Sequence, residues 1–204
     1  MIAQKWVCKE CGNSEVGVFP PKSCPECGAG RESFERENEY RFPKEEIDGV
    51  AAACWKISYG LYMVSSIDGE NINGQICNSF MQITSDPPRF AIGINHQNLT
   101  HEFIEKSGVF AASILGREDQ RIVRRFGYRS GREFDKFKGI SVVKGRTGCP
   151  VLKDSLGYIE CELIRDFQID AGTHSIFVGD VVGGKVLKDE APMTYEYYHK
   201  NKQR

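Results

Sequence analysis

Two Cys-x-x-Cys pairs near the N-terminus restrict the structure of this chain more than any other feature of its sequence. Cys8 and Cys11 form the first pair, Cys24 and Cys27 form the second pair, and twelve residues separate the two pairs. A glycine follows each pair, and glycine readily adopts the left-handed backbone angle of a tight turn. Two such turns placed face to face bring four thiolates into a tetrahedron. We therefore predict a metal site whose ligands are these four cysteines.

The spacing alone does not choose the metal, because zinc and iron both accept four thiolates in a tetrahedron. Two disulfides are the competing interpretation of the same cysteines. The first residues, MIAQKWVC, lack the apolar core and cleavage site of an export signal. Eight cysteines in a chain without such a signal indicate a reducing environment, where thiols bind metals or are buried. We therefore expect a cytoplasmic protein.

Charge and hydropathy argue against two classes of partner. The chain has 27 basic and 28 acidic residues, so its formal net charge is -1. This balance lacks the basic surface that is typical of nucleic-acid binding proteins. No apolar run approaches the roughly 20 residues that are needed to cross a bilayer. We therefore expect neither a nucleic-acid partner nor a membrane partner.

The composition of the chain changes after the cysteine pairs, which indicates two parts of unequal size. We predict a four-cysteine metal domain over residues 1–36 and a polar, charged linker over 37–46. A core-forming domain is predicted over 47–204. A length of 204 residues suits one medium domain with a small appendage.

The larger part reads as a series of short β-strands with few helices. The predicted strands are 59–66, 89–95, 109–115, 140–145, 158–169 and 175–187, and the predicted helices are 45–57, 100–108 and 117–127. Thr100 is a candidate N-cap and Gly108 a candidate helix end. Short strands with scattered helices favour an antiparallel barrel over alternating βαβ units, so we predict a mainly β fold.

A polar stretch after the first predicted strand is the candidate binding segment. Its small polar and amide residues are Asn73, Gln75, Asn78 and Ser79. Asp86, Pro87 and Pro88 follow and are expected to set a sharp turn. A loop of hydroxyls, amides and backbone donors beside a helix N-terminus suits a phosphate and a polar heterocycle. An ordinary polar loop is the alternative interpretation.

Motifs in this larger part resemble the flavin reductase-like family of FMN-binding split barrels. Residues 64–94 carry an Asn-Gly run, an Asn-Ser pair and two prolines that enter a strand. Residues 171–182, AGTHSIFVGDVV, are similar to the family's Gly-Asp-His motif, with Thr173 where aspartate is usual. Residues 126–139 and 192–200 resemble one subgroup, the high-molecular-weight rubredoxins, which fuse this domain to a rubredoxin. The resemblance runs from about residue 50 to residue 200.

The cysteine segment resembles the rubredoxin-like module of rubrerythrins, in which aromatic residues pack around an iron held by four cysteines. Trp6, the Cys24-Pro25 pair and Phe34 carry this resemblance. Asn13 departs from it, because many rubredoxins have an aromatic residue at that position. Together the two resemblances imply an FMN-binding split β-barrel, which is a Greek-key antiparallel barrel with short helices. They also imply an N-terminal rubredoxin-like domain that binds iron, with zinc as the alternative metal.

The family resemblance implies which residues bind FMN and which residue is catalytic. The implied flavin contacts are Ser65, Ser66, Asn73, Gln75, Ile76, Cys77, Asn78, Ser79, Asn95, Asn98 and Thr100. His174 matches the family's histidine near the flavin and the nicotinamide. The family binds flavin at a homodimer interface, which leads us to expect a homodimer, with Tyr195, Tyr197 and Tyr198 reaching the partner subunit.

Other polar residues have plainer interpretations. His96 and His101 are expected to be surface or capping residues, and Cys161 is expected in the core. Five arginines between residues 121 and 132 are expected to form a solvated face. Contact with a nucleotide phosphate or an acidic partner is the alternative role for this arginine group.

The resulting hypothesis is an electron-transfer flavoprotein with NAD(P)H as the donor. Electrons would pass through FMN to the four-cysteine iron and on to an acceptor such as a flavodiiron oxygen or nitric oxide reductase. One alternative is an NAD(P)H-dependent flavin reductase with a structural zinc ribbon. An alternative of another class is a non-redox zinc-ribbon module that binds a protein partner.

Overall fold

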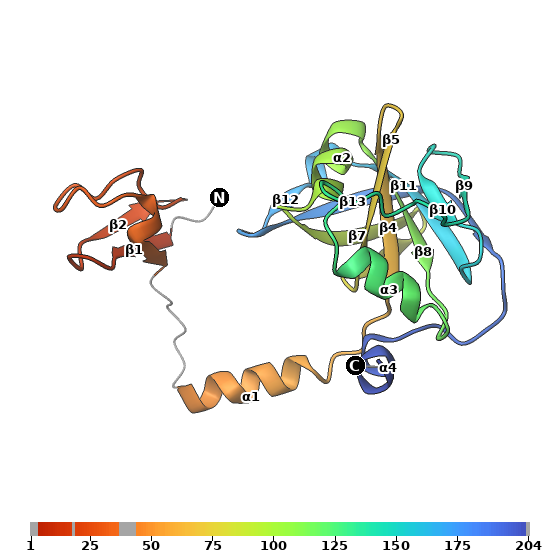
Figure 1. Cartoon of the computed structure of the whole chain (residues 1–204), viewed down its shortest axis with the longest axis horizontal. Helices are drawn as coiled ribbons and strands as arrows, with labels where there is room; N and C mark the ends of the chain where they lie inside the picture. The colour runs from red at the N-terminus through yellow and green to blue at the C-terminus, as the bar shows by residue number, and fades with distance from the viewer. Residues whose placement is uncertain (1–3, 18, 37–43, 203–204) are drawn as a thin grey trace. The chain divides into compact units, whose positions relative to one another are not determined.

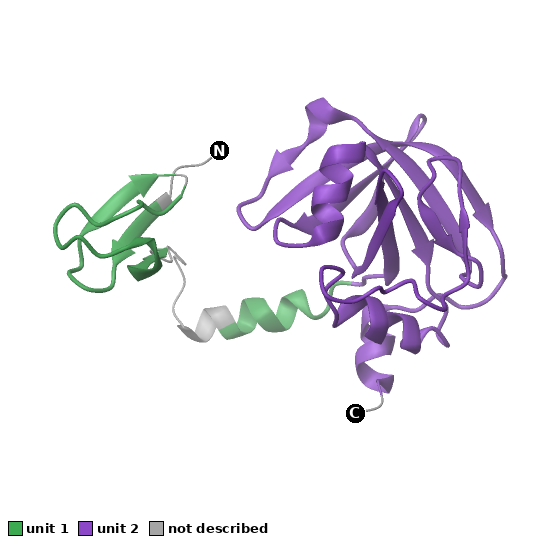
Figure 2. Cartoon of the chain, turned by 45° about the horizontal axis from the view of Figure 1, so that its top comes forward, with its two compact units in different colours: residues 1–57 green, residues 58–204 purple. Residues whose placement is uncertain are grey.

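The chain divides into two compact units, residues 1–57 and 58–204 (Figure 2). The computed structural model in Figure 1 describes residues 4–17, 19–36 and 44–202. Most of the expected linker, 37–46, lies outside these residues, and the expected domain boundaries stay a prediction. Within the described ranges, no helix is both long enough and apolar enough to cross a bilayer.

Unit 1 is built around a small antiparallel sheet in the order β2-β1-β3. Its elements are β1 (Gln4–Cys8), β2 (Ser14–Gly17), the 3-10 turn η1 (Arg31–Ser33) and β3 (Phe34–Arg36). Cys8, Cys24 and Phe34 are buried, and Trp6 packs against them. The indole N–H of Trp6 donates to the Gly17 carbonyl oxygen at 3.1 Å. The two aromatic residues therefore pack beside the cysteines, as the resemblance implied.

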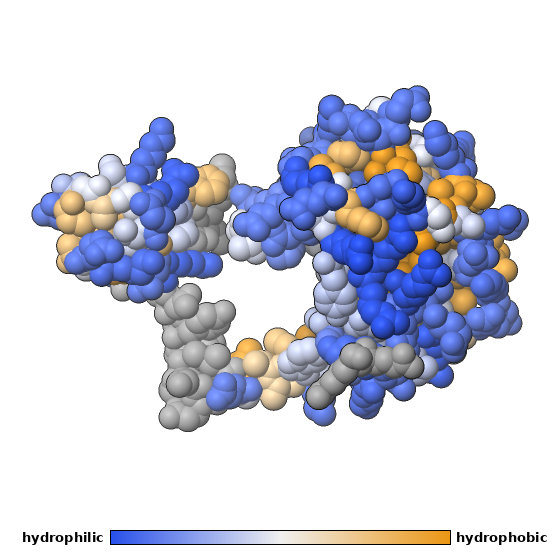
Figure 3. All heavy atoms as spheres, viewed as in Figure 1, coloured by the Kyte–Doolittle hydropathy of each residue, from blue (hydrophilic) through white to orange (hydrophobic). Residues whose placement is uncertain are grey.

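The predicted helix before the larger unit is present as α1 (Lys44–Cys54). Its apolar residues Val50, Ala51 and Cys54 are exposed, and Figure 3 colours part of this helix as hydrophobic.

Unit 2 is mainly antiparallel sheet with short helices. Its strands are β4 (Tyr62–Asp68), β5 (Asn71–Cys77), β6 (Phe80–Ser85), β7 (Pro88–Asn95), β8 (Val109–Ile114), β9 (Val142–Lys144), β10 (Pro150–Leu152), β11 (Gly157–Leu163), β12 (Ile169–Asp170) and β13 (His174–Val186). Its helices are α2 (Leu99–Ser107), α3 (Gln120–Gly127), the 3-10 turn η2 (Arg165–Phe167) and α4 (Tyr195–Asn201). The predicted mainly β fold is confirmed.

The strand order explains why the large sheet curls into a barrel. The strands follow the path β5-β4-β8-β11-β13-β7-β6, with β12 added beside β13. Its two edge strands, β5 and β6, are consecutive in sequence, and only Asn78 and Ser79 separate them. Three backbone steps span at most about 10 Å, so these edges must approach each other at that end. Because β5 and β6 are not paired in the sheet, the barrel is split along this line.

Apolar residues fill the barrel and the space under its helices. Inside the barrel, Phe110 and Phe177 are completely buried, and the ring of Phe80 stacks on that of Phe90 with 4.5 Å between centroids. A second cluster beneath α3 and α4 contains Tyr198, which was expected to reach a partner subunit. Tyr198 is instead buried in the core of its own unit.

Two local predictions were wrong. The stretch from Asn73 to Cys77 was expected to be a loop but forms strand β5, because its backbone pairs in register with β4. Thr100 was expected to cap α2, but Asn98 is the capping residue and Thr100 lies inside the helix. The hydroxyl of Thr100 is engaged by the Asn73 side chain instead. Gly108 ends α2 as predicted, with a φ of 73°.

Candidate functional site

The four cysteines of unit 1 come together as a cluster. Their sulfur atoms all lie within 4.8 Å of one another. The Sγ atoms of Cys8 and Cys27 are 3.7 Å apart, and those of Cys11 and Cys24 are 3.5 Å apart. A tetrahedron with metal–sulfur bonds of about 2.3 Å has edges of about 3.8 Å, so the cluster is a four-thiolate metal site.

Two equivalent turns position these thiols. Gly12 and Gly28 have φ angles of 75° and 74°, and each donates its N–H to the carbonyl oxygen of the first cysteine of its pair. The backbone N–H of Cys27 is the largest factor that lowers the pKa of the Cys24 thiol to about 7. This backbone donor therefore favours the thiolate of Cys24, which is the form that binds a metal.

Unit 2 contains a separate cavity of about 310 Å³ beside the N-terminus of α2. Its lining includes the predicted flavin contacts Asn73, Gln75, Ile76, Asn98 and Thr100. Gln97 and Leu99 lie beside Asn98 in the lining. The opposite part of the lining comes from α3 and the following segment, and its residues are Phe126, Gly127, Tyr128, Arg129, Ser130, Gly131 and Lys136. Known ligand pockets range from about 300 to 1,000 Å³, so the volume lies at the lower end of that range.

Asn73 links three elements at this cavity. Its amide nitrogen donates to the Thr100 hydroxyl at 2.9 Å, which ties β5 to α2. Gly131 packs against the other end of the same amide. A methyl group added at Gly131 would lie 2.1 Å from the Asn73 Oδ1 atom, so only glycine allows this close approach.

Lys136 and Gln75 are unusual polar residues in the same wall. The Lys136 ammonium donates to the Gly74 carbonyl at 2.8 Å and to the Phe126 carbonyl at 3.2 Å. Burial lowers the pKa of Lys136 to about 8. The Oε1 atom of Gln75 is buried and has no hydrogen-bond partner. The cavity therefore offers a buried cation and an unsatisfied buried acceptor.

The other predicted flavin contacts lie outside the lining of this cavity. The hydroxyls of Ser65 and Ser66 are buried and donate to the carbonyl oxygens of Pro150 and Val109. The other members of this group are Cys77, Asn78, Ser79 and Asn95. Asn95 accepts a hydrogen bond from the Gln97 backbone N–H at 2.9 Å. The structure thus brings five of the eleven predicted contacts together in one cavity.

Cys77 and Ser79 lie where β5 gives way to β6. The Cys77 Sγ and Ser79 Oγ atoms are 3.4 Å apart, and the Ser79 hydroxyl donates to the Gly93 carbonyl at 3.0 Å. Cys77 is buried, and burial raises the pKa of its thiol. This thiol is therefore neutral near pH 7 and acts as a small buried side chain.

His174 is exposed at the start of β13, opposite Asn95 of β7. Its Nδ1 atom lies 2.8 Å from the hydroxyl of Thr173. A hydroxyl can therefore orient this ring at the position where the family motif has a carboxylate. The role of His174 as the catalytic residue stays a prediction.

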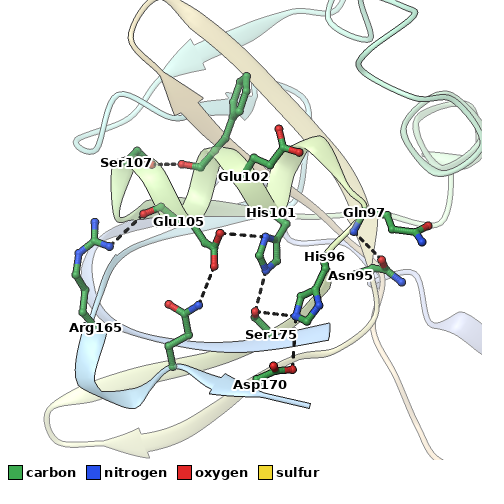
Figure 4. Close-up of polar contacts among 12 residues, drawn as sticks. Asn95, His96, Gln97, His101, Glu102, Glu105, Ser107, Arg165, Asp170 and Ser175 are labelled. Carbon is green, nitrogen blue, oxygen red and sulfur yellow. Dashed lines mark hydrogen bonds and ion pairs between the residues drawn. The ribbon is translucent and has the colours of Figure 1, made fainter. Parts of the chain in front are cut away.

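A buried histidine lies beside this region, contrary to expectation. Figure 4 shows His96 and His101 pointing toward the same hydroxyl, that of Ser175. The His101 Nε2 atom is 2.8 Å from it, and the His96 Nε2 atom is 3.2 Å from it. His101 was expected at the surface but is 5% exposed, because Phe177 packs against its ring. Burial lowers the pKa of His101, which keeps the ring neutral near pH 7.

The five arginines between residues 121 and 132, in α3 and just after it, do not form one uniform solvated face. In Figure 3 the most hydrophilic patch on this side of unit 2 lies over α3, where Arg121 and Arg124 are exposed. Arg125 instead donates from its side chain to the carbonyls of Lys136 and Lys138. Arg129 lines the cavity. The sequence did not predict Lys136 as a cavity residue, because its segment has the composition of a charged surface. The resemblance of residues 126–139 to the rubredoxin subgroup was the sequence feature that could have indicated a functional role for Lys136.

The split barrel and its polar cavity define a class of flavin-binding proteins, and sequence comparison agrees. The family described as "Flavin reductase like domain" matches residues 55–204. The chain therefore belongs to the flavin reductase-like family. This membership confirms the predicted split-barrel fold and the predicted class of flavin oxidoreductase. The four-cysteine cluster lies outside the matched residues.

Two curated relatives and one solved structure are similar to this chain. A high molecular weight rubredoxin of Moorella thermoacetica is 48% identical over 152 residues, which cover 74% of this chain and 66% of that protein. A ferric-chelate reductase (NAD(P)H) of Archaeoglobus fulgidus is 41% identical over 149 residues, 72% of this chain and 87% of that protein. An FMN-binding protein from Thermus thermophilus has a TM-score of 0.60 and 27% identity, covering 64% of this chain and 72% of that chain.

Proposed function

We propose that the protein is an NAD(P)H-dependent flavin oxidoreductase that passes electrons from a bound FMN to an iron held by its own four cysteines. A bound flavin accepts two electrons with a proton, as hydride, from a reduced nicotinamide. A four-thiolate iron site accepts and releases single electrons. The observation that carries the proposal is that one chain holds both a flavin reductase domain and a four-thiolate cluster.

The residues of the cavity fit a flavin. A flavin has a polar edge with hydrogen-bond donors and acceptors, and FMN adds a phosphate. The unsatisfied acceptor of Gln75 suits a donor on the ring. The N-terminus of α2 and the Arg129 side chain suit a phosphate. These features support FMN as the cofactor.

The cluster residues fit an iron as well as a zinc ion. Thiolates suit both metals, so the flavin neighbour is the reason for choosing iron: only a redox-active metal can receive electrons. Fusion in one chain keeps the flavin and the metal at high effective concentration. The proposed acceptor is a second redox protein, such as a flavodiiron oxygen or nitric oxide reductase, and the proposed assembly is a homodimer with flavin near the interface.

A visible spectrum of the purified full chain tests the proposal. We expect two flavin bands together with a broader ferric–thiolate absorbance at longer wavelength. NADH or NADPH should bleach the flavin bands first and the ferric absorbance afterwards, with air excluded. Metal analysis of protein from iron-rich medium should give one iron per chain.

Two results would contradict this function. Flavin bands with one zinc per chain, and no iron after expression in iron-rich medium, would identify a flavin reductase with a structural zinc ribbon. Protein without a chromophore that takes up no FMN on reconstitution would contradict any flavin-dependent activity and favour a non-redox module.

A further inference from the structure

Lys136 is a buried cation without an anionic partner. The residue is 6% exposed, and in the described part of the chain no carboxylate forms an ion pair with it. Its hydrogen-bond acceptors are two backbone carbonyls, those of Gly74 and Phe126. An ammonium has three N–H donors, so one remains for another group. Burying an unpaired charge destabilises a fold, which means that this lysine is costly to keep.

The fold fixes Lys136 in this position. The Arg125 side chain donates to the Lys136 carbonyl at 2.6 Å, and Asp135 accepts from the backbone N–H groups of Phe137 and Lys138. Phe137 is buried against the ring of Phe126, with 5.0 Å between centroids. The backbone on both sides of Lys136 is therefore held, and its side chain is directed inward between β5 and α3.

Gln75 supplies the complementary group. Lys136 binds the carbonyl of Gly74, the residue directly before Gln75 on β5, and both side chains line the same cavity. The Oε1 atom of Gln75 accepts no hydrogen bond, although it is buried. A buried acceptor without a donor carries a free-energy penalty of about 1–3 kcal/mol. A ligand edge that presents an N–H donor beside an electron-rich oxygen or nitrogen would satisfy both residues.

The pyrimidine edge of a flavin has this pattern. Its N3–H is a donor, and the adjacent C2 carbonyl and N1 are acceptors. When hydride arrives from a reduced nicotinamide, the nicotinamide is oxidised, two electrons and one proton enter the ring, and a negative charge remains over N1 and the C2 carbonyl. Hydride transfer therefore needs no further reactant, and a nearby cation favours its product.

We propose that Gln75 accepts the N3–H and that Lys136 binds the N1–C2 edge of the flavin, where its charge stabilises the reduced form. This inference rests on the proposed function, because it requires a flavin in the cavity. Lys136 is then the residue that sets the reduction potential of the cofactor. A higher potential makes the flavin a better acceptor from nicotinamide and a weaker donor to the next centre.

The phosphate of FMN is the other anion that Lys136 could bind. The position of Lys136 in the cavity wall argues against this contact. Arg129 and Ser130 are exposed at the rim, beside the N-terminus of α2. A dianion suits this solvated rim, where a guanidinium and backbone donors are available. Lys136 and the Gln75 Oε1 atom lie in the buried part of the wall, which suits a ring edge.

The test compares Lys136→Met with Lys138→Met in the full chain. Lys138 is exposed and two residues away, so its loss removes the same charge without touching the cavity. For each variant the dissociation constants of oxidised and reduced FMN are measured, and also those of riboflavin, which lacks the phosphate. We expect Lys136→Met to reduce the preference for reduced over oxidised flavin at least tenfold, about 30 mV for a two-electron couple. The reduction should be equal for FMN and riboflavin, and Lys138→Met should change neither.

Each other outcome has a defined meaning. A loss of affinity confined to FMN would place the ammonium at the phosphate and overturn the inference. An unchanged preference in Lys136→Met would also overturn it. If Lys136→Met does not fold, Lys136→Gln removes the charge and keeps a donor, and Gln75→Leu should weaken FMN and riboflavin equally. Failure of the unmodified protein to bind any flavin would instead contradict the proposed function.

Discussion

The two units of this chain are stabilised by different means. Unit 1 has a core of Cys8, Cys24 and Phe34, and two of these three residues belong to the metal cluster. Unit 2 encloses large apolar side chains such as Phe110 and Phe177 inside a barrel. Small domains bury too little apolar surface to be stable without a metal or disulfides. The comparison indicates that unit 1 depends on its metal, whereas unit 2 depends on hydrophobic burial.

The largest expected effect is the loss of the metal. We predict that Cys8→Ser abolishes metal binding and unfolds unit 1, because structural zinc sites of this kind contribute roughly 10–16 kcal/mol to folding. Metal content and protease cleavage within residues 4–36 measure this effect. Cys54→Ser is the matched control, since Cys54 is exposed and outside the cluster. Flavin content should be unchanged, and a loss of flavin would show that the units are not independent.

The reverse experiment perturbs unit 2 alone. Phe177→Ala is expected to destabilise the barrel by about 3–5 kcal/mol, because it leaves a cavity in a fully buried core. Calorimetry should show a lower Tm for unit 2, by roughly 2–4 °C for each kcal/mol of lost stability. The exposed Phe167 provides a control, and its alanine variant should cost less than about 1 kcal/mol. If the metal–thiolate absorbance were lost together with the stability of the barrel, the two units would not be stabilised independently.

A smaller effect concerns the pH dependence of unit 2 without flavin. The pKa of Lys136 is lowered to about 8, below its ordinary value, so the unfolded chain binds more protons between about pH 8 and pH 10.5. The contribution of Lys136 to the free energy of unfolding therefore rises with pH across that window and is constant below it. At pH 7 we expect Lys136→Met to be more stable than the unmodified protein by about 1–3 kcal/mol. Chemical denaturation should show this difference shrinking towards pH 10, and a constant difference would contradict the prediction.

The smallest predicted effect is Gly131→Ala. The added methyl group would lie 2.1 Å from the Asn73 Oδ1 atom, which forces the amide away from Thr100. Loss of this buried hydrogen bond should weaken FMN binding roughly tenfold, or about 1.4 kcal/mol. Titration with FMN measures the change. Gly49→Ala adds a methyl with no heavy atom within 4 Å, outside the lining of the cavity, and should bind FMN normally. Equal affinity for FMN in both variants would show that Asn73 does not contribute to FMN binding.

Local patterns made the metal cluster and much of the barrel predictable. The geometry of the two metal-binding turns depends on residues that are close in sequence, namely the cysteines and the glycines at 12 and 28. Their spacing therefore predicts the cluster directly. Strands β8 and β13 were predicted because they are runs of apolar and β-branched residues. Strand β6 was not predicted: it is an edge strand whose first residue alone is buried, and its apolar residues Met81 and Ile83 are exposed. Strand β5 was missed because its polar residues face a cavity rather than solvent.

Residues whose roles depend on long-range packing were not predictable. Lys136 belongs to a run of charged residues, and such runs are usually solvated. Its burial results from contacts with Gly74, more than sixty residues earlier in the chain. His101 is likewise buried by Phe177, a residue of a distant strand. Pairing between residues far apart in sequence leaves no local pattern, so one sequence alone does not reveal it.

The strand order also fixes the timing of assembly during synthesis. Ile92 of β7 pairs with Phe177 of β13, 85 residues later in the chain (177 minus 92). At a synthesis rate of about 5–20 residues per second, the β6–β7 hairpin waits roughly 4–17 s for its partner strand. Until then Ile92, which is buried in the completed barrel, has no barrel around it. The contacts of the four-cysteine cluster lie within residues 8–27, so the ribosome releases a complete metal site long before the barrel can close.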